Sequence, residues 1–421
     1  MNPFSPAQLR QLAQAHGTPL WVYDADTIRQ RIAELRAFDT IRFAQKANSN
    51  LHLLALMRDE GVKVDAVSLG EIERALAAGF RPGTHDVDGH GEAEIVFTAD
   101  LIDRATLAKV VAEQIPVNAG SIDMLEQLGA ASPGHRVWLR INPGFGHGHS
   151  NKTNTGGEHS KHGIWHADLP AALQAITRHG LHLVGLHMHI GSGVDYHHLQ
   201  QVCDAMVAMV ARLDRPIEAI SAGGGLSIPY RAGEPRIDTA HYFALWNGAR
   251  RRIAEAQGRP LKLELEPGRY LVAESGVLLA EVRATKSMGS RFFALVDAGF
   301  NELMRPAMYG AHHGIELIAA DGAGHVAPRP LRDTVVAGPL CESGDVFTQG
   351  DGGTVLSREL PAARVGDLLV FHDAGAYGAS MSSNYNSRPL TAEVLVDADR
   401  TRLIRRRQTI GELLALEQPA R

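Results

Sequence analysis

Lys46 is a residue whose type and surroundings allow covalent chemistry. It lies in the segment Phe43-Ala44-Gln45-Lys46-Ala47-Asn48, directly after residues 41–44, whose apolar character is typical of a strand. An amine at a strand end can be partly removed from water, which disfavours the ammonium form and leaves a nucleophile that forms an imine with an aldehyde. A lysine taken alone is more often a surface residue whose apolar stem covers the protein. The interpretation of Lys46 therefore depends on what the chain brings to it.

Two histidines two residues apart offer a second centre for chemistry. They lie in His187-Met188-His189-Ile190-Gly191-Ser192-Gly193, where the period of a strand places both rings on one face. Such a pair can bind zinc, but no further ligands fall at a matching strand end. The alternative is that His189 packs flat on an aromatic cofactor and Ser192 binds its phosphate. The sequence favours the cofactor.

Glycine-rich segments supply the means to hold a phosphate. Gly223-Gly224-Gly225 follows one expected strand and Glu266-Pro267-Gly268-Arg269 follows the next. Glycine backbone lets N–H groups approach an anion, although three glycines alone more often mark a turn. With Arg269 and Lys46 beside them, these segments indicate a site for pyridoxal phosphate. Glu266 is then the carboxylate that keeps the pyridine nitrogen protonated, an arrangement suited to decarboxylation.

The elements that position these residues alternate between strand and helix. Eight apolar segments predict parallel strands, each separated from the next by a helix-length segment: 41–44, 62–66, 95–97, 115–118, 137–142, 183–187, 219–222 and 262–266. Eight such units close into a (β/α)8 barrel, the TIM-like architecture, whereas an open doubly wound sheet is less consistent with seven consecutive crossovers. In a closed barrel the first and eighth strands are neighbours, so we expect Lys46 and Glu266 to lie close together.

The pattern changes after Tyr270. Strands without intervening helices are predicted at 277–284, 292–297, 334–337, 367–372 and 392–396, which indicates an antiparallel β-domain. We therefore expect a barrel over 27–270 and a β-domain built from 1–26 and 271–421. Thr409 and Glu412 fit a helix capping box, and the arginines at 405–407 read as a solvated edge. Residues 143–165 form a long loop typical of a lid.

Composition excludes several classes of protein. The 421 residues are 44% hydrophobic and 21% charged with a net charge of −5, so no basic field points to nucleic acid or anionic lipid. Two cysteines make no disulfide framework. We find neither a signal peptide nor a membrane-spanning run, so we expect a soluble, cytoplasmic protein with no nucleic-acid or membrane partner.

Seven motifs together carry a resemblance to a known family. They are Phe-Ala-Gln-Lys-Ala-Asn around Lys46, Ser-Leu-Gly-Glu at 68–71, the His-Ile-Gly-Ser-Gly, Gly-Gly-Gly and Glu-Pro-Gly-Arg segments, Cys341-Glu342-Ser343-Gly344-Asp345, and 375–389. In this order, from about residue 21 to 417, they resemble the fold-type III pyridoxal-phosphate decarboxylases, most closely the diaminopimelate decarboxylases. The resemblance implies an alanine racemase-like barrel with a C-terminal β-domain. It also implies a head-to-tail homodimer with shared active sites.

The resemblance assigns roles residue by residue. Lys46 matches the Schiff-base lysine, His189 the ring-stacking histidine and Glu266 the partner of the pyridine nitrogen. The matches to phosphate ligands are Ser192, Gly225, Gly268, Arg269 and Tyr377. The matches to substrate ligands are Arg269, Arg305, Tyr309, Glu342 and Tyr377. Cys341, supplied by the partner subunit, matches the acid that protonates Cα, and Asp65 and Arg140 are candidates to orient Lys46 and the ring hydroxyl.

The expected reaction is decarboxylation of meso-2,6-diaminopimelate to L-lysine and CO2, the last step of lysine biosynthesis. Two arginines suit a substrate with more than one carboxylate, and Glu342 suits its distal ammonium. Another basic amino acid, such as ornithine, arginine, D-lysine or D-ornithine, is the nearest alternative substrate. A non-catalytic binding relative and a metal hydrolase on the same barrel are the more distant alternatives. Cys203, on an apolar helix, is predicted to pack in the core.

Overall fold

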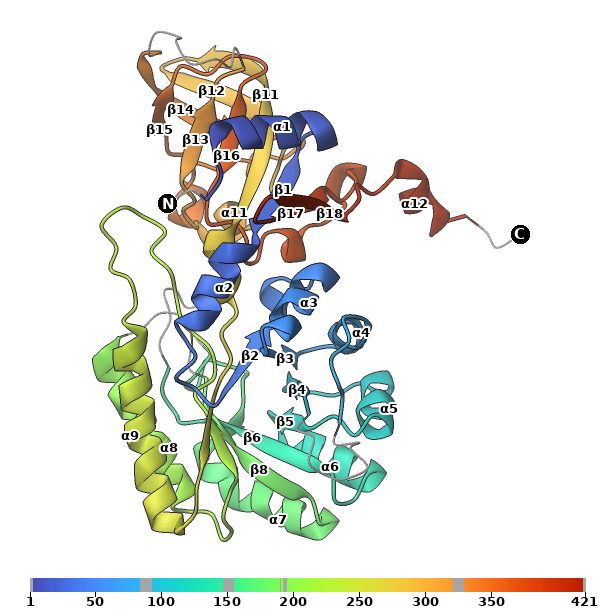
Figure 1. The fold of residues 1–421 in the computed structure, drawn as a ribbon, viewed down its shortest axis with the longest axis vertical. Helices are drawn as coiled ribbons and strands as arrows, with labels where there is room; N and C mark the ends of the chain where they lie inside the picture. The colour runs from blue at the N-terminus through green and yellow to red at the C-terminus, as the bar shows by residue number, and fades with distance from the viewer. Residues whose placement is uncertain are drawn as a thin grey trace. The chain divides into compact units, whose positions relative to one another are not determined.

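The computed structural model describes residues 3–83, 93–146, 155–189, 191, 195–320 and 329–418. The chain divides into two compact units (Figure 1). One is formed by Arg31–Ser227 and Arg236–Tyr270, and the other by Met1–Gln30, Ile228–Pro235 and Leu271–Arg421. We call them the barrel unit and the β unit.

The barrel unit is a closed parallel barrel, as predicted. Its strands are β2 (Thr40–Ala44), β3 (Lys63–Ala66), β4 (Ile95–Ala99), β5 (Val117–Ala119), β6 (Arg136–Asn142), β8 (His182–His187), β9 (Ala219–Ser221) and β10 (Lys262–Leu265). Each pairs in parallel with its neighbours, β5 pairs with β6, and β2 pairs with β10 to close the ring. The expected neighbourhood of the first and eighth strands is therefore confirmed. Part of the long loop forms a short strand, β7 (Ile164–Trp165), beside β6.

Helices connect the barrel strands. They are α3 (Leu51–Asp59), α4 (Leu69–Ala77), α5 (Arg104–Ala112), α6 (Ile122–Ala131), α7 (Leu169–His179), α8 (Tyr196–Val210) and α9 (Thr239–Gln257), and α10 (Arg269–Val272) follows the last strand, β10. Most begin at a side chain that accepts a hydrogen bond from a first-turn N–H, as Ser68 does from Glu71 at α4. Glycines in the left-handed conformation end α7 and α9, at Gly180 and Gly258. Single-turn helices are η1 (Gln45–Ala47) and η3 (His166–Asp168).

A buried ion pair lies inside the barrel unit. Arg42 Nε on β2 donates to Glu264 Oε2 on β10 at 2.6 Å, and Nη2 donates to Oε1 at 3.3 Å. Both side chains are about 6% exposed, so this two-point bond is what makes the burial of the two charges tolerable. Arg42 thereby places a fixed positive charge beneath the strand ends.

The β unit has a nine-stranded sheet. Its strands are β1 (Leu20–Asp24), β11 (Gly276–Met288), β12 (Arg291–Val296), β13 (Ile315–Ile318), β14 (Leu331–Ala337), β15 (Arg358–Pro361), β16 (Leu368–Phe371), β17 (Ala392–Asp397) and β18 (Arg400–Arg405). Most pairs are antiparallel, but β1 pairs with β17 and β12 with β14 in parallel. The expected antiparallel pattern therefore holds for most of the sheet, and the two parallel pairs make it a mixed sheet in which β1, from the N-terminus, lies between β11 and β17.

The core of the β unit packs one helix on this sheet. Helix α1 (Pro6–His16) is capped by Ser5 and buries Leu9 and Leu12 against Leu20 and Leu279. Further helices in or entering this unit are α2 (Ala25–Ala33), α11 (Arg305–Tyr309) and α12 (Ile410–Ala415), with single turns η4 (Ala273–Ser275), η5 (Asp351–Gly353), η6 (Ala379–Met381) and η7 (Tyr385–Ser387). The capping box of Thr409 and Glu412 at α12 is confirmed.

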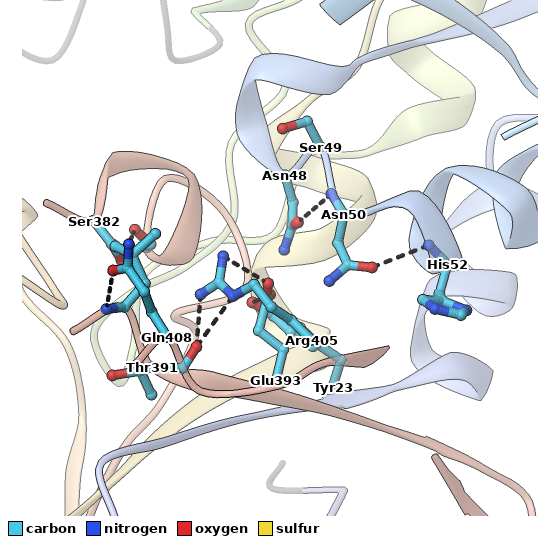
Figure 2. Close-up of polar contacts among 12 residues, drawn as sticks. Tyr23, Asn48, Ser49, Asn50, His52, Ser382, Thr391, Glu393, Arg405 and Gln408 are labelled. Atoms are coloured by element: carbon cyan, nitrogen blue, oxygen red, sulfur yellow. Dashed lines mark hydrogen bonds and ion pairs between the residues drawn. The ribbon is translucent and has the colours of Figure 1, made fainter. Parts of the chain in front are cut away.

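The arginines at 405–407 are more than a solvated edge. Figure 2 shows Arg405 beside Glu393, and its Nη1 atom lies 2.9 Å from Glu393 Oε1. The other carboxylate oxygen accepts a hydrogen bond of 2.7 Å from the hydroxyl of Tyr23. Glu393 is 1% exposed, so these partners keep a buried carboxylate satisfied between β1, β17 and β18. The prediction failed because the partner strand β18 was not recognised.

Among the described residues, no helix is long and apolar enough to cross a membrane.

Candidate active site

The carboxyl ends of the barrel strands bring the predicted residues of the barrel unit together. Lys46 is in η1, directly after β2, with Gln45 and Ala47 buried on either side of it. The backbone N–H of Ala44 donates to the carbonyl of Pro267 at 3.1 Å, so the segments that carry Lys46 and Glu266 are adjacent. The lysine itself is exposed, whereas we expected a partly desolvated amine. Its charge nevertheless acts on the buried groups Asp65, Glu71 and His189.

Two asparagines fix the backbone that follows Lys46. Asn48 Oδ1 accepts a hydrogen bond from the N–H of Asn50 at 3.2 Å, and Asn50 Oδ1 accepts one from His52 at 3.0 Å (Figure 2). Asn50 is thereby the N-cap of α3, and both asparagines are buried. The short link between β2 and α3 is rigidly held, which fixes the starting point of the lysine side chain.

The Ser-Leu-Gly-Glu motif is a capping motif. Ser68 Oγ accepts from the N–H of Glu71 at 3.2 Å, and Glu71 Oε2 accepts from the N–H of Val67 at 2.8 Å. These two bonds fix the turn between β3 and α4. Burial raises the pKa of Glu71, against the pull of the Val67 bond and of the charges of Lys46 and Arg74.

A row of polar residues crosses three neighbouring strands. Arg140 on β6 is opposite His187 on β8, and His187 is opposite Ser221 on β9. Two of these residues bind Glu266, which follows β10: His187 Nε2 lies 2.7 Å from Oε2, and Ser221 Oγ donates to Oε1 at 3.0 Å. Each oxygen of the Glu266 carboxylate therefore has its own donor.

The pKa of Glu266 is lowered to about 2. Burial opposes ionisation, but the interaction with His187, the hydrogen bond from Ser221 and the charge of Arg42 outweigh it. Glu266 is thus a buried carboxylate that stays ionised at any physiological pH. It can hold a positive charge opposite it.

Asp65 on β3 is a second buried carboxyl group, and its pKa shifts in the direction opposite to that of Glu266. It is 4% exposed, and its Oδ1 atom has no hydrogen-bond partner among the described residues. Burial, and then the charge of Glu266, raise its pKa well above the ordinary value, against a hydrogen bond from Thr98 and the charge of Lys46. A buried polar atom without a partner at the mouth of the barrel is what a site for a polar ligand provides.

The two histidines have different partners. No group of three metal-ligating side chains occurs in the part of the chain that the structure describes. His187 turns to Glu266, whereas His189 Nδ1 accepts a hydrogen bond of 3.2 Å from the N–H of Gly224. Burial, and then the charges of Arg140 and Lys46, hold the pKa of His189 well below its ordinary value. His189 is therefore a neutral ring of fixed orientation.

The glycine segments bring backbone close to backbone. A Cβ atom at Gly225, which has φ of +101°, would overlap the carbonyl oxygen of Gly191, and one at Gly224 would lie 2.6 Å from the carbonyl oxygen of Glu266. A Cβ atom at Gly268 would lie 3.2 Å from the carbonyl oxygen of Ala44. Only glycine permits these close contacts of backbone with backbone. Ser192 lies outside the described residues.

In the β unit, Arg305 begins α11 and is 6% exposed. Its Nη1 atom lies 2.9 Å from Nε2 of His313, and its guanidinium lies 4.7 Å from the ring centroid of Tyr230. Tyr309, at the end of α11, is partly buried. Arg305 is therefore a charged group that the fold has already oriented.

Cys341 and Glu342 are exposed residues of a firmly anchored loop. Asp345 is 3% exposed and accepts hydrogen bonds from the N–H groups of Leu340 and Phe300, each at 2.8 Å. The N–H of Cys341 donates to Asn386 Oδ1 at 2.9 Å. Cys341 is therefore not a buried structural thiol, whereas Cys203 is 1% exposed in α8 as predicted.

Tyr377 and Arg269 are both partly buried. Tyr377 has φ of +56°, a left-handed conformation that a bulky residue adopts only where surrounding structure imposes it. The next residue, Gly378, leaves no room for a Cβ atom beside the ring of Trp21. Arg269 is the first residue of α10, directly after the Glu266–Gly268 segment.

The residues present fit pyridoxal phosphate. The barrel mouth offers an amine, an ionised buried carboxylate, a neutral imidazole, closely packed glycine loops, and an oxygen of Asp65 that has no hydrogen-bond partner among the described residues. Sequence reasoning missed the His187–Glu266 and Ser221–Glu266 bonds and the Arg305–His313 pair. The spacing of the histidines marked His187, but nothing local marked Ser221 or His313.

Comparison with known proteins agrees with this geometry. Residues 25–273 match the pyridoxal-binding domain of the pyridoxal-dependent decarboxylases. The chain is 67% identical to a diaminopimelate decarboxylase of Escherichia coli over 409 residues, covering 97% of this chain and 96% of the relative. This chain belongs to the diaminopimelate decarboxylase family.

Further members of the family agree. A diaminopimelate decarboxylase of Streptomyces coelicolor is 65% identical and covers 97% of this chain and 91% of the relative. A crystal structure of a diaminopimelate decarboxylase superposes with a TM-score of 0.94 at 66% identity, covering 98% of this chain and 96% of that one. The Helicobacter pylori enzyme complexed with L-lysine superposes with a TM-score of 0.83 at 30% identity, covering 97% and 99%. The fold and the pyridoxal phosphate cofactor expected from the sequence are confirmed.

Proposed function

We propose that the protein decarboxylates meso-2,6-diaminopimelate to L-lysine and CO2 with pyridoxal phosphate as cofactor, the last step of lysine biosynthesis. The observation that carries the proposal is 67% identity across 97% of the chain to a diaminopimelate decarboxylase. The alternative substrates ornithine, arginine, D-lysine and D-ornithine are not favoured, because relatives 67% and 65% identical to this chain bear the diaminopimelate name.

When bound, pyridoxal phosphate accepts the electron pair that the departing CO2 leaves behind. In the proposed site Lys46 binds the cofactor covalently through Nζ. Glu266, ionised, accepts a hydrogen bond from the ring nitrogen, and His189 packs on the ring. The backbone at Gly225 and Gly268 and the side chains of Ser192, Arg269 and Tyr377 would hold the phosphate.

Substrate recognition follows from charge. Arg305 is oriented in advance, and a guanidinium binds a carboxylate through two parallel N–H bonds, so we assign to it a carboxylate of the substrate. Arg269, Tyr309 and Tyr377 complete the polar contacts in this proposal. Glu342 binds the distal ammonium. These assignments distinguish a substrate with two carboxylates from an amino acid with one.

Cys341 is the proposed acid, delivering a proton from Sγ to the carbon that has lost CO2. In the proposed homodimer it comes from the partner subunit, and its exposure on an anchored loop of the single chain is consistent with that role. We also propose a cytoplasmic location, where an enzyme of amino-acid biosynthesis meets its substrate and cofactor.

The test is turnover by the purified protein supplied with pyridoxal phosphate. CO2 and amine products are measured from meso-diaminopimelate, ornithine, arginine and both enantiomers of lysine in parallel. We expect a clear preference for meso-diaminopimelate with L-lysine as product. Preference for a substrate with one carboxylate would overturn the assignment of Arg305 and Glu342 and leave the cofactor site standing.

A further inference from the structure

His187 is a buried histidine of the barrel that the proposed reaction does not yet use. Its side chain is 2% exposed, and its Nε2 atom lies 2.7 Å from Oε2 of Glu266, whose side chain is 10% exposed. Because Nδ1 has no hydrogen-bond partner among the described residues, the bond from Nε2 to Glu266 is what sets the orientation of the ring. Nε2 therefore carries a hydrogen and donates it.

The position of His187 is fixed by the register of the barrel. It is the last residue of β8 and lies opposite Ser221, the last residue of β9. Glu266 follows the last residue of β10, the next strand around the ring, and its own N–H donates to the carbonyl of Gly223 at 2.8 Å. Consecutive strand ends thus supply one donor to each oxygen of a single carboxylate.

Comparison of Glu266 with Asp65 shows what these donors achieve. Both carboxyl groups are buried at the strand ends of one barrel, 8% and 4% exposed. Asp65 has an unpartnered oxygen, and burial raises its pKa; Glu266 has a donor on each oxygen, and its pKa is lowered to about 2. The neighbours of these two buried carboxyl groups thereby shift the two pKa values in opposite directions.

From this geometry we infer that His187 is a positioning residue for the cofactor: its Nε2–H orients the Glu266 carboxylate and keeps it available to the pyridine nitrogen. The inference rests on the role proposed above for Glu266 and deepens it. Without the donor, one oxygen of Glu266 would be a buried acceptor with no partner, and the carboxylate would rotate or compete for the proton of the ring nitrogen.

The experiment separates a bond to the ring nitrogen from general support of the fold. Full-length wild type and the variants His187→Leu and His187→Gln are loaded with pyridoxal phosphate or with its analogue in which C–H replaces the ring nitrogen. Equilibrium dialysis gives the dissociation constant of each. Glutamine carries an N–H near the position of Nε2, whereas leucine has no donor.

We expect His187→Leu to weaken binding of pyridoxal phosphate about ten- to a hundredfold, the loss typical of a hydrogen bond to a buried charge. His187→Gln should recover most of this affinity. For the carbon analogue all three proteins should bind alike, because it has no ring nitrogen for Glu266 to hold. His135→Leu is the matched control: His135 is 2% exposed in the same unit, and its Nε2 lies 2.7 Å from the carbonyl of Ile115 instead.

Equal losses for both cofactors, or no loss for either, would overturn the inference. If His187→Leu does not fold, His187→Asn takes its place, because an asparagine amide at 187 is too short to reach Glu266 and should behave like leucine. If wild type binds the two cofactors equally, Glu266 makes no bond to the ring nitrogen, and the inference about His187 is overturned with it. If the cofactor affinities follow the expected pattern but wild type does not turn over meso-diaminopimelate, only the proposed substrate is overturned.

Discussion

Nη1 of Arg305 donates a hydrogen bond to Nε2 of His313 over 2.9 Å, and this bond fixes the tautomer of the histidine. A guanidinium only donates, so Nε2 must accept and the proton of the ring lies on Nδ1, which is 2.8 Å from the carbonyl oxygen of His372. His313 is 4% exposed. The chain of bonds from the His372 carbonyl to Arg305 holds the arginine in one orientation.

Replacing His313 by alanine should therefore raise the KM for meso-diaminopimelate about fivefold or more and change kcat less, because Arg305 loses an acceptor that orients it. Steady-state kinetics with saturating pyridoxal phosphate measure both constants. His182→Ala is the control, since His182 is exposed on β8 and pairs with Glu218. An unchanged KM would show that Arg305 does not need His313.

Lys46→Ala should abolish activity and also the visible absorption of the covalently bound cofactor, because no other group at the end of β2 carries an amine. The spectrum is recorded after dialysis against buffer without cofactor. The control is Lys109→Ala. Lys109 lies on α5 and pairs with Glu73 and Glu113. Turnover retained by Lys46→Ala would end the Schiff-base assignment.

Cys341→Ala should keep the cofactor and lose most of the rate, whereas Cys203→Ala should keep the rate, because Cys203 only packs in α8. If the active sites are shared, mixing inactive Lys46→Ala and Cys341→Ala subunits should restore activity. In a symmetric dimer the recovery is limited to about a quarter of wild type, since half of the dimers are mixed and each has one intact site. Absence of recovery after verified subunit exchange would place Lys46 and Cys341 of one chain in the same site.

The barrel could be predicted from the sequence because each of its strands and helices can be recognised from its own short segment. Each parallel strand requires a crossover, so eight apolar segments separated by helices determine both the architecture and the closure of β2 on β10. The β unit could not be predicted to the same depth. β18 is rich in arginine, β15 contains a proline and β13 has four residues, and the parallel pairing of β1 with β17 joins segments 372 residues apart at Leu20 and Ala392.

Local structure around the site could be predicted where the signal lies within one segment, as for the glycines at 223–225, two of which have positive φ. The site was not predictable where a residue's role depends on register across strands, as for Ser221 and His187 on Glu266. The exposure of Lys46 was also missed, because the single turn of η1 that follows β2 has no strong sequence signal. Contacts between side chains of different elements cannot be predicted from the pattern within one segment.

Glu302 makes stability depend on pH. Burial raises its pKa to about 7, against hydrogen bonds from the N–H of Gly299 and from Asn301 and the charge of Arg388. Between the ordinary value of 4.5 and about 7, the folded protein keeps a proton that the unfolded chain has released, so the free energy of unfolding falls as pH rises through this window. The loss is of the order of 3 kcal/mol at pH 8.

Glu302→Gln removes this titration. The melting temperature of the variant relative to wild type should therefore rise by a few degrees between pH 5 and pH 8. Thermal unfolding followed by circular dichroism at several pH values measures it, with the exposed Glu359→Gln as control. Parallel curves for Glu302→Gln and wild type would show that this carboxyl group ionises in the folded protein as it does in the unfolded chain, and that its neighbours compensate fully for its burial.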